Sequence, residues 1–124
     1  MKRKVLFYSV ARSDYDRYQP ILENLDKRKI DFAIALNSVH LNPKFGYTFK
    51  FIDKKFKIFK PNYIKNNFRD ESDLIDNFSR SINFLKKIFK KYKPDLLVVL
   101  GDRYEMLCAP ICAIQYNIPI IHFY

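Results

Sequence analysis

Glycine is scarce in this 124-residue chain, which contains only Gly46 and Gly101. Turns that need a positive φ must therefore be few, or must be built on Asn and Asp. The chain has no GxGxxG and no P-loop motif, which disfavours a standard dinucleotide or ATP site. Gly101 follows the apolar run LLVVL and directly precedes Asp102. One of the two glycines therefore lies between an apolar segment and charged residues.

Cysteine and long apolar runs are also scarce. Cys108 and Cys112 lie four residues apart in an apolar helical pattern, which matches neither a CxxC motif nor a zinc motif. We expect free buried thiols in a reducing compartment, and no metal or cofactor. No segment reaches the 18 apolar residues of a membrane span, and the basic N-terminus lacks a signal-peptide cleavage site. We therefore expect a cytoplasmic protein that does not bind a membrane.

Acidic residues are outnumbered, with 13 Asp and Glu against 23 Lys and Arg, for a net charge of +10. Such a balance favours anionic partners. Most of the lysines, however, occupy the predicted solvated side of a helix or lie in loops. The accompanying phenylalanines fall at core spacing and do not form a base-stacking pattern. We therefore predict no nucleic-acid partner.

Short apolar runs alternate with amphipathic segments along the chain. Strands are predicted over residues 4–10, 30–36, 56–59, 96–100 and 118–124; helices are predicted from Ser13 onward, over 72–92 and over 104–116. The first helix is expected to begin with a capping box of Ser13 and Asp16. Continuous apolar strands separated by helices predict one α/β domain over residues 1–124, a doubly wound, Rossmann-like parallel sheet. Because the chain stops on an apolar strand, we expect it to be part of a longer protein.

Ligands bind such sheets beyond the carboxyl ends of the strands. Asp102 lies at one of these ends, where a carboxylate can act as a general acid or base. The spacing of Asp102 and Glu105 is equally that of a capping box for the following helix, and residue patterns alone slightly favour the cap.

Three further residues are candidates for ligand binding, and two of them also have a structural interpretation. Arg12 follows the first strand and could bind an anion at a helix N-terminus, or could pair with Asp14 or Asp16 on the surface. His40 lies in a loop at the ligand-binding end. His122, in an apolar strand, fits a hydrogen-bonded core histidine better than a ligand.

Four collinear segments of the chain resemble the UDP-N-acetylglucosamine 2-epimerase family, closest to its hydrolysing branch. They are KVLFYSVARSDYD, ALNSVHLNPKFGYTF, KPDLLVVLGDRYEMLCAP and NIPIIHFY, and the GDRYE within the third is typical of that branch. The resemblance implies the N-terminal half of a glycosyltransferase-B-like enzyme, in which two Rossmann-like domains hold a UDP-sugar between them.

The resemblance also implies roles for individual residues. Asp102 matches the family's acid/base aspartate, Arg12 its diphosphate-binding arginine, and His40 and Arg103 lie in matching substrate-binding segments. The implied reaction releases UDP and a 2-epimerised sugar such as N-acetylmannosamine, by elimination followed by addition of water. The full-length enzyme is expected to be a homo-oligomer.

The chain departs from the family in what it lacks. The family's Gly-Gly-Glu segment, expected after Tyr124, and the C-terminal nucleotide-gripping domain are absent, so we expect this chain alone to be inactive. Two alternatives stay open: a UDP-sugar glycosyltransferase of the same architecture, and a non-catalytic binding module.

Overall fold

The computed structural model describes residues 2–62 and 67–124, and its strands form one parallel sheet. The strands are β1 (Lys4–Ser9), β2 (Asp31–Leu36), β3 (Ile58–Phe59), β4 (Leu96–Leu100) and β5 (Ile120–Phe123). The α-helices are α1 (Arg12–Lys27), α2 (Glu71–Tyr92) and α3 (Cys108–Gln115). The short 3₁₀ helices are η1 (Ser38–Leu41), η2 (Pro43–Phe45), η3 (Thr48–Phe51) and η4 (Tyr104–Leu107). The strand order is β3-β2-β1-β4-β5.

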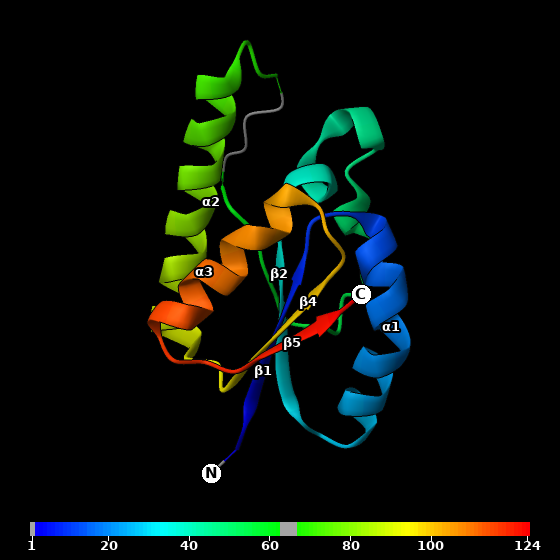
Figure 1. Cartoon of the computed structure of the whole chain (residues 1–124). Helices are drawn as coiled ribbons and strands as arrows, with labels where there is room; N and C mark the ends of the chain where they lie inside the picture. Colours follow the sequence, from blue (N-terminus) through cyan, green and yellow to red (C-terminus); the bar gives the residue numbers. More distant parts are fainter. Residues whose placement is uncertain (1, 63–66) are drawn as a thin grey trace.

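Helices cover both faces of this sheet, α2 and α3 on one side and α1 on the other (Figure 1). Alternate residues of each central strand enter the two cores. Leu6 and Tyr8 of β1 pack toward α2 and α3, whereas Phe7 packs against Tyr18 of α1 with ring centroids 5.1 Å apart. Burial on both faces explains why β1, β2 and β4 read as unbroken apolar runs. The predicted doubly wound α/β fold is confirmed.

The start of α1 differs from the prediction. The helix begins at Arg12 after the N-cap Ala11, and the carboxylate that reaches back to the cap belongs to Asp14, not Asp16. Ser13 is exposed, because the chain turns into the helix two residues earlier than expected. Pro20 lies inside the helix, where it removes one intrahelical hydrogen bond.

The predicted helix over 104–116 is divided in two. Its first turn is the 3₁₀ helix η4, and α3 begins only at Cys108. Pro110 is therefore the third residue of α3, where the backbone N–H that proline lacks has no partner in any helix.

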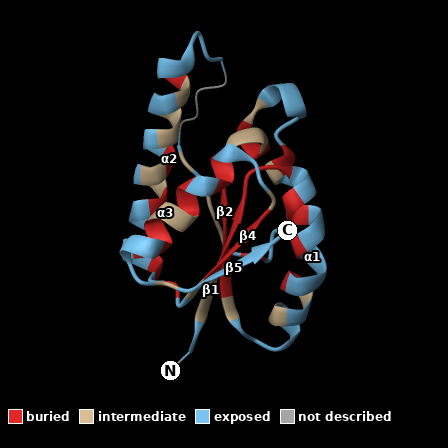
Figure 2. Ribbon diagram, in the orientation of Figure 1, coloured by how far each residue is buried: buried red, intermediate tan, exposed pale blue. Residues whose placement is uncertain are grey.

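The last strand, β5, is exposed along its whole length (Figure 2). Its apolar sequence is typical of a buried strand, but it pairs with β4 at the edge of the described sheet. Ile121 and Phe123 are 41% and 37% exposed because α1 lies over the middle of the sheet and does not cover this edge. An apolar sequence alone does not distinguish an edge strand from a central one.

Candidate functional site

The turn after β1 presents Arg12 at the carboxyl edge of the sheet. The buried carboxylate of Asp14 accepts hydrogen bonds from the backbone N–H groups of Val10 (3.0 Å) and Ala11 (3.2 Å), which fixes the entry into α1. Burial raises the pKa of Asp14, and the two N–H groups offset this only in part. Arg12 is exposed, with its guanidinium carbon 4.2 Å from the centroid of the Phe51 ring.

Of the two surface pairings weighed for Arg12, the structure contains the one with Asp16. The N···O distance is 3.8 Å, and both side chains are about half exposed. An exposed pair at this separation contributes little to stability. The stacking on Phe51 therefore does more to orient the guanidinium than the ion pair does.

His40 is fully buried and bonds to protein hydroxyls through both ring nitrogens. The Ser9 hydroxyl donates to the Ala11 carbonyl (3.2 Å), so Nε2 of His40 donates to Ser9 Oγ (2.7 Å) and Nδ1 accepts from Thr48 Oγ1 (3.0 Å). Burial lowers the pKa of His40 to about 4, which keeps the ring neutral. In this structure His40 thus links the β1 turn to η1 and η3, and the predicted contact with substrate stays a prediction.

The segment after β4 does not form the predicted capping box. Neither η4 nor α3 has a side-chain cap, and Asp102 is exposed. Glu105 is buried and accepts hydrogen bonds from Arg103 (2.6 Å) and from Ser38 Oγ (2.9 Å). Burial alone would raise the pKa of Glu105, but the bonds from Arg103 and Ser38 outweigh it and hold that pKa below its ordinary value.

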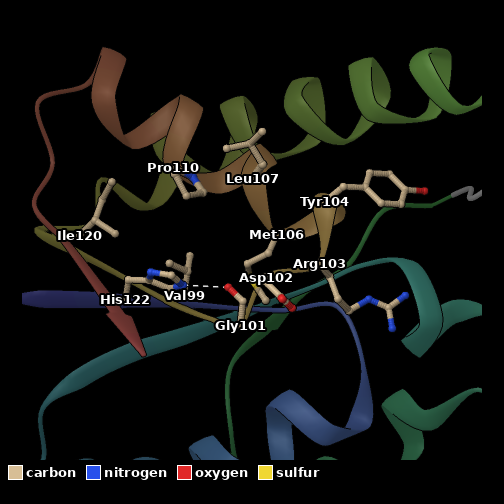
Figure 3. Close-up of a pocket in the computed structure, with 10 residues that line it drawn as sticks. All are labelled: Val99, Gly101, Asp102, Arg103, Tyr104, Met106, Leu107, Pro110, Ile120 and His122. Carbon is tan, nitrogen blue, oxygen red and sulfur yellow. Dashed lines mark hydrogen bonds between the residues drawn. The ribbon is translucent and has the colours of Figure 1, made fainter. Parts of the chain in front are cut away.

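A cavity of about 410 Å³ opens at the carboxyl ends of β4 and β5 (Figure 3). Its polar side chains are Asp102, Arg103, Tyr104 and His122, and its apolar wall consists of Val99, Met106, Leu107, Pro110 and Ile120. In the close-up, His122 and Ile120 lie on one side of Asp102, and Arg103 extends away on the other. The structure therefore brings Asp102 and Arg103 to one cavity, which Arg12 and His40 do not line.

His122 is the lining residue that sequence reasoning missed. Its side chain is exposed, and its Nε2–H donates to the carbonyl oxygen of Gly101 at 2.8 Å. The expectation of a core histidine is wrong, because His122 lies on the edge strand β5 opposite Val99 of β4. A signal was available, since His122 lies near the carboxyl end of its strand, the end at which such sheets bind ligands.

Two classes of feature are absent from residues 2–62 and 67–124. No group of three or more His, Cys, Asp or Glu side chains in these ranges is arranged to hold a metal ion. Among the same residues, no helix is both long enough and apolar enough to cross a membrane.

The sequence of the chain is similar to those of known proteins. The sequence profile of the family described as UDP-N-acetylglucosamine 2-epimerase matches residues 23–124. The chain is 33% identical over 124 residues to the GDP/UDP-N,N'-diacetylbacillosamine 2-epimerase (hydrolyzing) of Campylobacter jejuni, covering 98% of this chain and 32% of the relative. It is 29% identical over 126 residues to the UDP-N,N'-diacetylbacillosamine 2-epimerase (hydrolyzing) of Legionella pneumophila, covering 100% of this chain and 33% of the relative.

Solved structures share the fold at lower identity. A UDP-N-acetylglucosamine 2-epimerase described as putative, from Listeria monocytogenes, superposes with a TM-score of 0.73 at 18% identity, covering 98% of this chain and 30% of that one. The Neisseria meningitidis UDP-GlcNAc 2-epimerase bound to UDP-GlcNAc gives 0.70 at 22% identity, covering 98% and 31%. The chain thus spans about a third of the length of its relatives. The match over residues 23–124 and the 33% identity show that this chain belongs to the UDP-N-acetylglucosamine 2-epimerase family.

Proposed function

We propose that this chain is the N-terminal, sugar-binding part of a hydrolysing 2-epimerase that acts on a UDP-linked 2-acetamido sugar. The observation that carries the proposal is the position of Asp102 on the cavity at the carboxyl end of β4. This is the edge at which doubly wound sheets bind their ligands. The names of the relatives support the same reaction class.

Asp102 has the acid/base role in this proposal. The C2 proton of the sugar is removed while the C1–O bond to UDP breaks, which gives a glycal-type intermediate. Water then adds its oxygen at C1, and a proton returns to C2 from the opposite face. A carboxylate next to the sugar ring can take or return this proton. Asp102 is exposed on the cavity and forms no helix cap, so its carboxylate is available to a ligand.

Arg12 and Arg103 are proposed to bind the diphosphate of UDP, the leaving group. Arg103 lines the cavity beside Asp102, and its bonds to Glu105 hold it in place. Arg12 lies at the N-terminus of α1 with its guanidinium stacked on Phe51. Guanidinium groups bind phosphate oxygens in a fork geometry. We assign Arg12 and Arg103 to the diphosphate, with a second, glycosyltransferase-B-like domain of the full-length protein completing the nucleotide site.

The apolar wall favours a sugar that carries methyl groups. Met106, Leu107, Pro110 and Ile120 face the cavity on which Asp102 lies. Two relatives are named for N,N'-diacetylbacillosamine, a 6-deoxy sugar with two acetamido groups. One added methyl in an apolar pocket changes specificity by about 10- to 200-fold. We therefore propose that kcat/KM for UDP-N,N'-diacetylbacillosamine exceeds that for UDP-N-acetylglucosamine by about tenfold or more.

The test measures UDP release by the full-length protein with each of the two UDP-sugars. Asp102→Asn is expected to lower kcat by about 100-fold or more, whereas Asp76→Asn, on the exposed surface of α2, retains activity. Unchanged release in Asp102→Asn would refute the catalytic assignment. Release that requires an added acceptor would favour the glycosyltransferase. Failure of the intact protein to release UDP at all would leave the non-catalytic binding module.

A further inference from the structure

Residues of β5 form hydrogen bonds with both backbone polar groups of Gly101, which directly follows β4. The backbone N–H of Gly101 donates to the carbonyl of Phe123 at 2.9 Å, and the carbonyl of Gly101 accepts from Nε2 of His122 at 2.8 Å. Gly101 has a φ of +85°, a conformation that L-residues rarely adopt. The chain therefore leaves β4 in a turn whose two polar backbone groups are both fixed.

Fixing the Gly101 carbonyl also fixes the start of Asp102. A peptide unit is planar, so the carbonyl of Gly101 and the N–H and Cα of Asp102 rotate as one rigid group. A hydrogen bond that sets the direction of this carbonyl consequently sets the position of the Asp102 Cα and the N–Cα axis about which its side chain can turn. In Figure 3 the bond from His122 to Gly101 lies directly beside Asp102 on the cavity wall.

We propose that His122 is a positioning residue for Asp102. It acts through the Gly101 carbonyl to aim the carboxylate at the sugar, and it does not itself take the C2 proton. The inference rests on the catalytic role proposed for Asp102.

Strand pairing and core packing do not require this imidazole. The backbone register of Leu97–Ile120, Val98–Ile121 and Leu100–Phe123 already joins β5 to β4. The side chain of His122 is exposed on the cavity and contributes no volume to either core. Its neighbours in β5 are isoleucine and phenylalanine, which cannot donate a hydrogen bond to a carbonyl. His122 therefore differs from its neighbours in β5 by its ability to donate a hydrogen bond to the Gly101 carbonyl.

Two substitutions in the full-length protein distinguish the effect of the hydrogen-bond donor of His122 from the effect of its ring. His122→Phe keeps a flat ring but removes the donor, and we expect kcat to fall by about 10- to 100-fold while KM stays within about twofold. His122→Gln retains an amide donor of similar reach, and we expect kcat within about threefold of the wild type. Ile121→Val on the opposite face of β5 is the matched control and leaves kcat unchanged.

A double-mutant cycle tests whether His122 acts through Asp102. In the Asp102→Asn background, His122→Phe is expected to lower kcat by no more than about twofold further. An equal loss in both backgrounds would overturn the inference, as would failure of His122→Gln to restore kcat in a protein whose thermal midpoint is unchanged. If His122→Phe does not fold, the glutamine variant alone decides the question.

The same variants distinguish this inference from the proposed function. Full activity of Asp102→Asn would refute the catalytic role of Asp102 and the positioning role with it. A strong loss in Asp102→Asn together with full activity of His122→Phe would refute the positioning role only.

Discussion

A single buried histidine connects three segments at the carboxyl edge of the sheet. His40 bonds to Ser9 and Thr48 through its two ring nitrogens, so a proton added to Nδ1 would replace an acceptor with a second donor. Burial lowers the pKa of His40 and outweighs the Ala11 backbone and the Asp16 charge, which both favour the protonated ring. At the scale of the residue, this connection between the three segments depends on His40 staying neutral.

We expect acid to destabilise the fold through His40. Its pKa is about 4 in the folded chain and 6.5 when unfolded, so between these values the unfolded state binds more protons and stability falls as pH falls. Between pH 7 and pH 5 the loss is about 2 kcal/mol, measured as the free energy of unfolding in urea.

The control for this experiment is His40→Gln, which has no titrating ring and should lose most of this slope. A wild-type protein whose free energy of unfolding is equal at pH 7 and pH 5 would contradict the prediction.

At the scale of the element, the start of α1 shows how a helix is placed by tertiary contacts. The sequence offers Ser13 with Asp16 as a cap, but the structure uses Asp14 on the N–H groups of Val10 and Ala11. Tyr15, Tyr18 and Leu22 must face the sheet, and this requirement sets the rotation and the starting point of the helix.

We expect Asp14→Ala to destabilise the fold by about 2 kcal/mol, because two buried N–H groups lose a charged acceptor. Asp14→Asn keeps one acceptor oxygen and should cost about 1 kcal/mol. The matched control is Ser13→Ala, expected to stay within about 0.5 kcal/mol. Chemical denaturation measures the free energy of unfolding of all three variants. A larger loss of stability in Ser13→Ala than in Asp14→Ala would favour Ser13 as the N-cap, as the sequence suggested.

The packing of α3 on α2 predicts the chemistry of the two thiols. Cys108 and Cys112 are buried against the carbonyls of Phe78 and Ile82, and burial raises the pKa of Cys108 to about 12. Because the thiolate is the reactive form, we expect neither thiol to react with a disulfide reagent at pH 8 in the native chain, and both to react in urea. Ser13→Cys, at an exposed position, is the positive control; rapid labelling of the native wild type would contradict the packing.

At the scale of the whole molecule, the sheet is well covered in the middle and poorly covered at β5. The strand is exposed on its full length, with Ile121 and Phe123 on the face away from the cavity. The net charge of +10 opposes contact between copies of the chain. The exposed apolar strand favours contact between copies, whereas the positive charge opposes it. Salt screens the charge and leaves the apolar strand unchanged.

We therefore expect the 124-residue chain to self-associate more strongly as NaCl is raised, because screening removes the repulsion and leaves the apolar edge. Ile121→Lys places a charge on that edge and should suppress the association, whereas Ile75→Lys, at a still more exposed isoleucine of α2, should not. Sedimentation velocity at several salt concentrations measures the effect. Association that weakens with salt would point to ion pairs instead.

The sequence alone predicted the fold class, because strands buried on both faces must be apolar throughout and α2 must be amphipathic to cover them. It also placed Asp102 at the ligand-binding edge. It did not reveal the partners of Glu105 or the position of His122. Ser38 lies 67 residues from Glu105 and Gly101 lies 21 residues from His122, so no local pattern relates them.

Local composition and periodicity therefore determined which segments are strands and helices and which carboxylate lies at a strand end. Only the tertiary structure decided which strand is at the edge, which aspartate caps α1, and which side chains share a cavity with Asp102. The physical reason is that periodicity shows which face of each segment is apolar and packs on a core. Sheet edges, helix caps and cavities instead depend on contacts between segments that are distant in the chain.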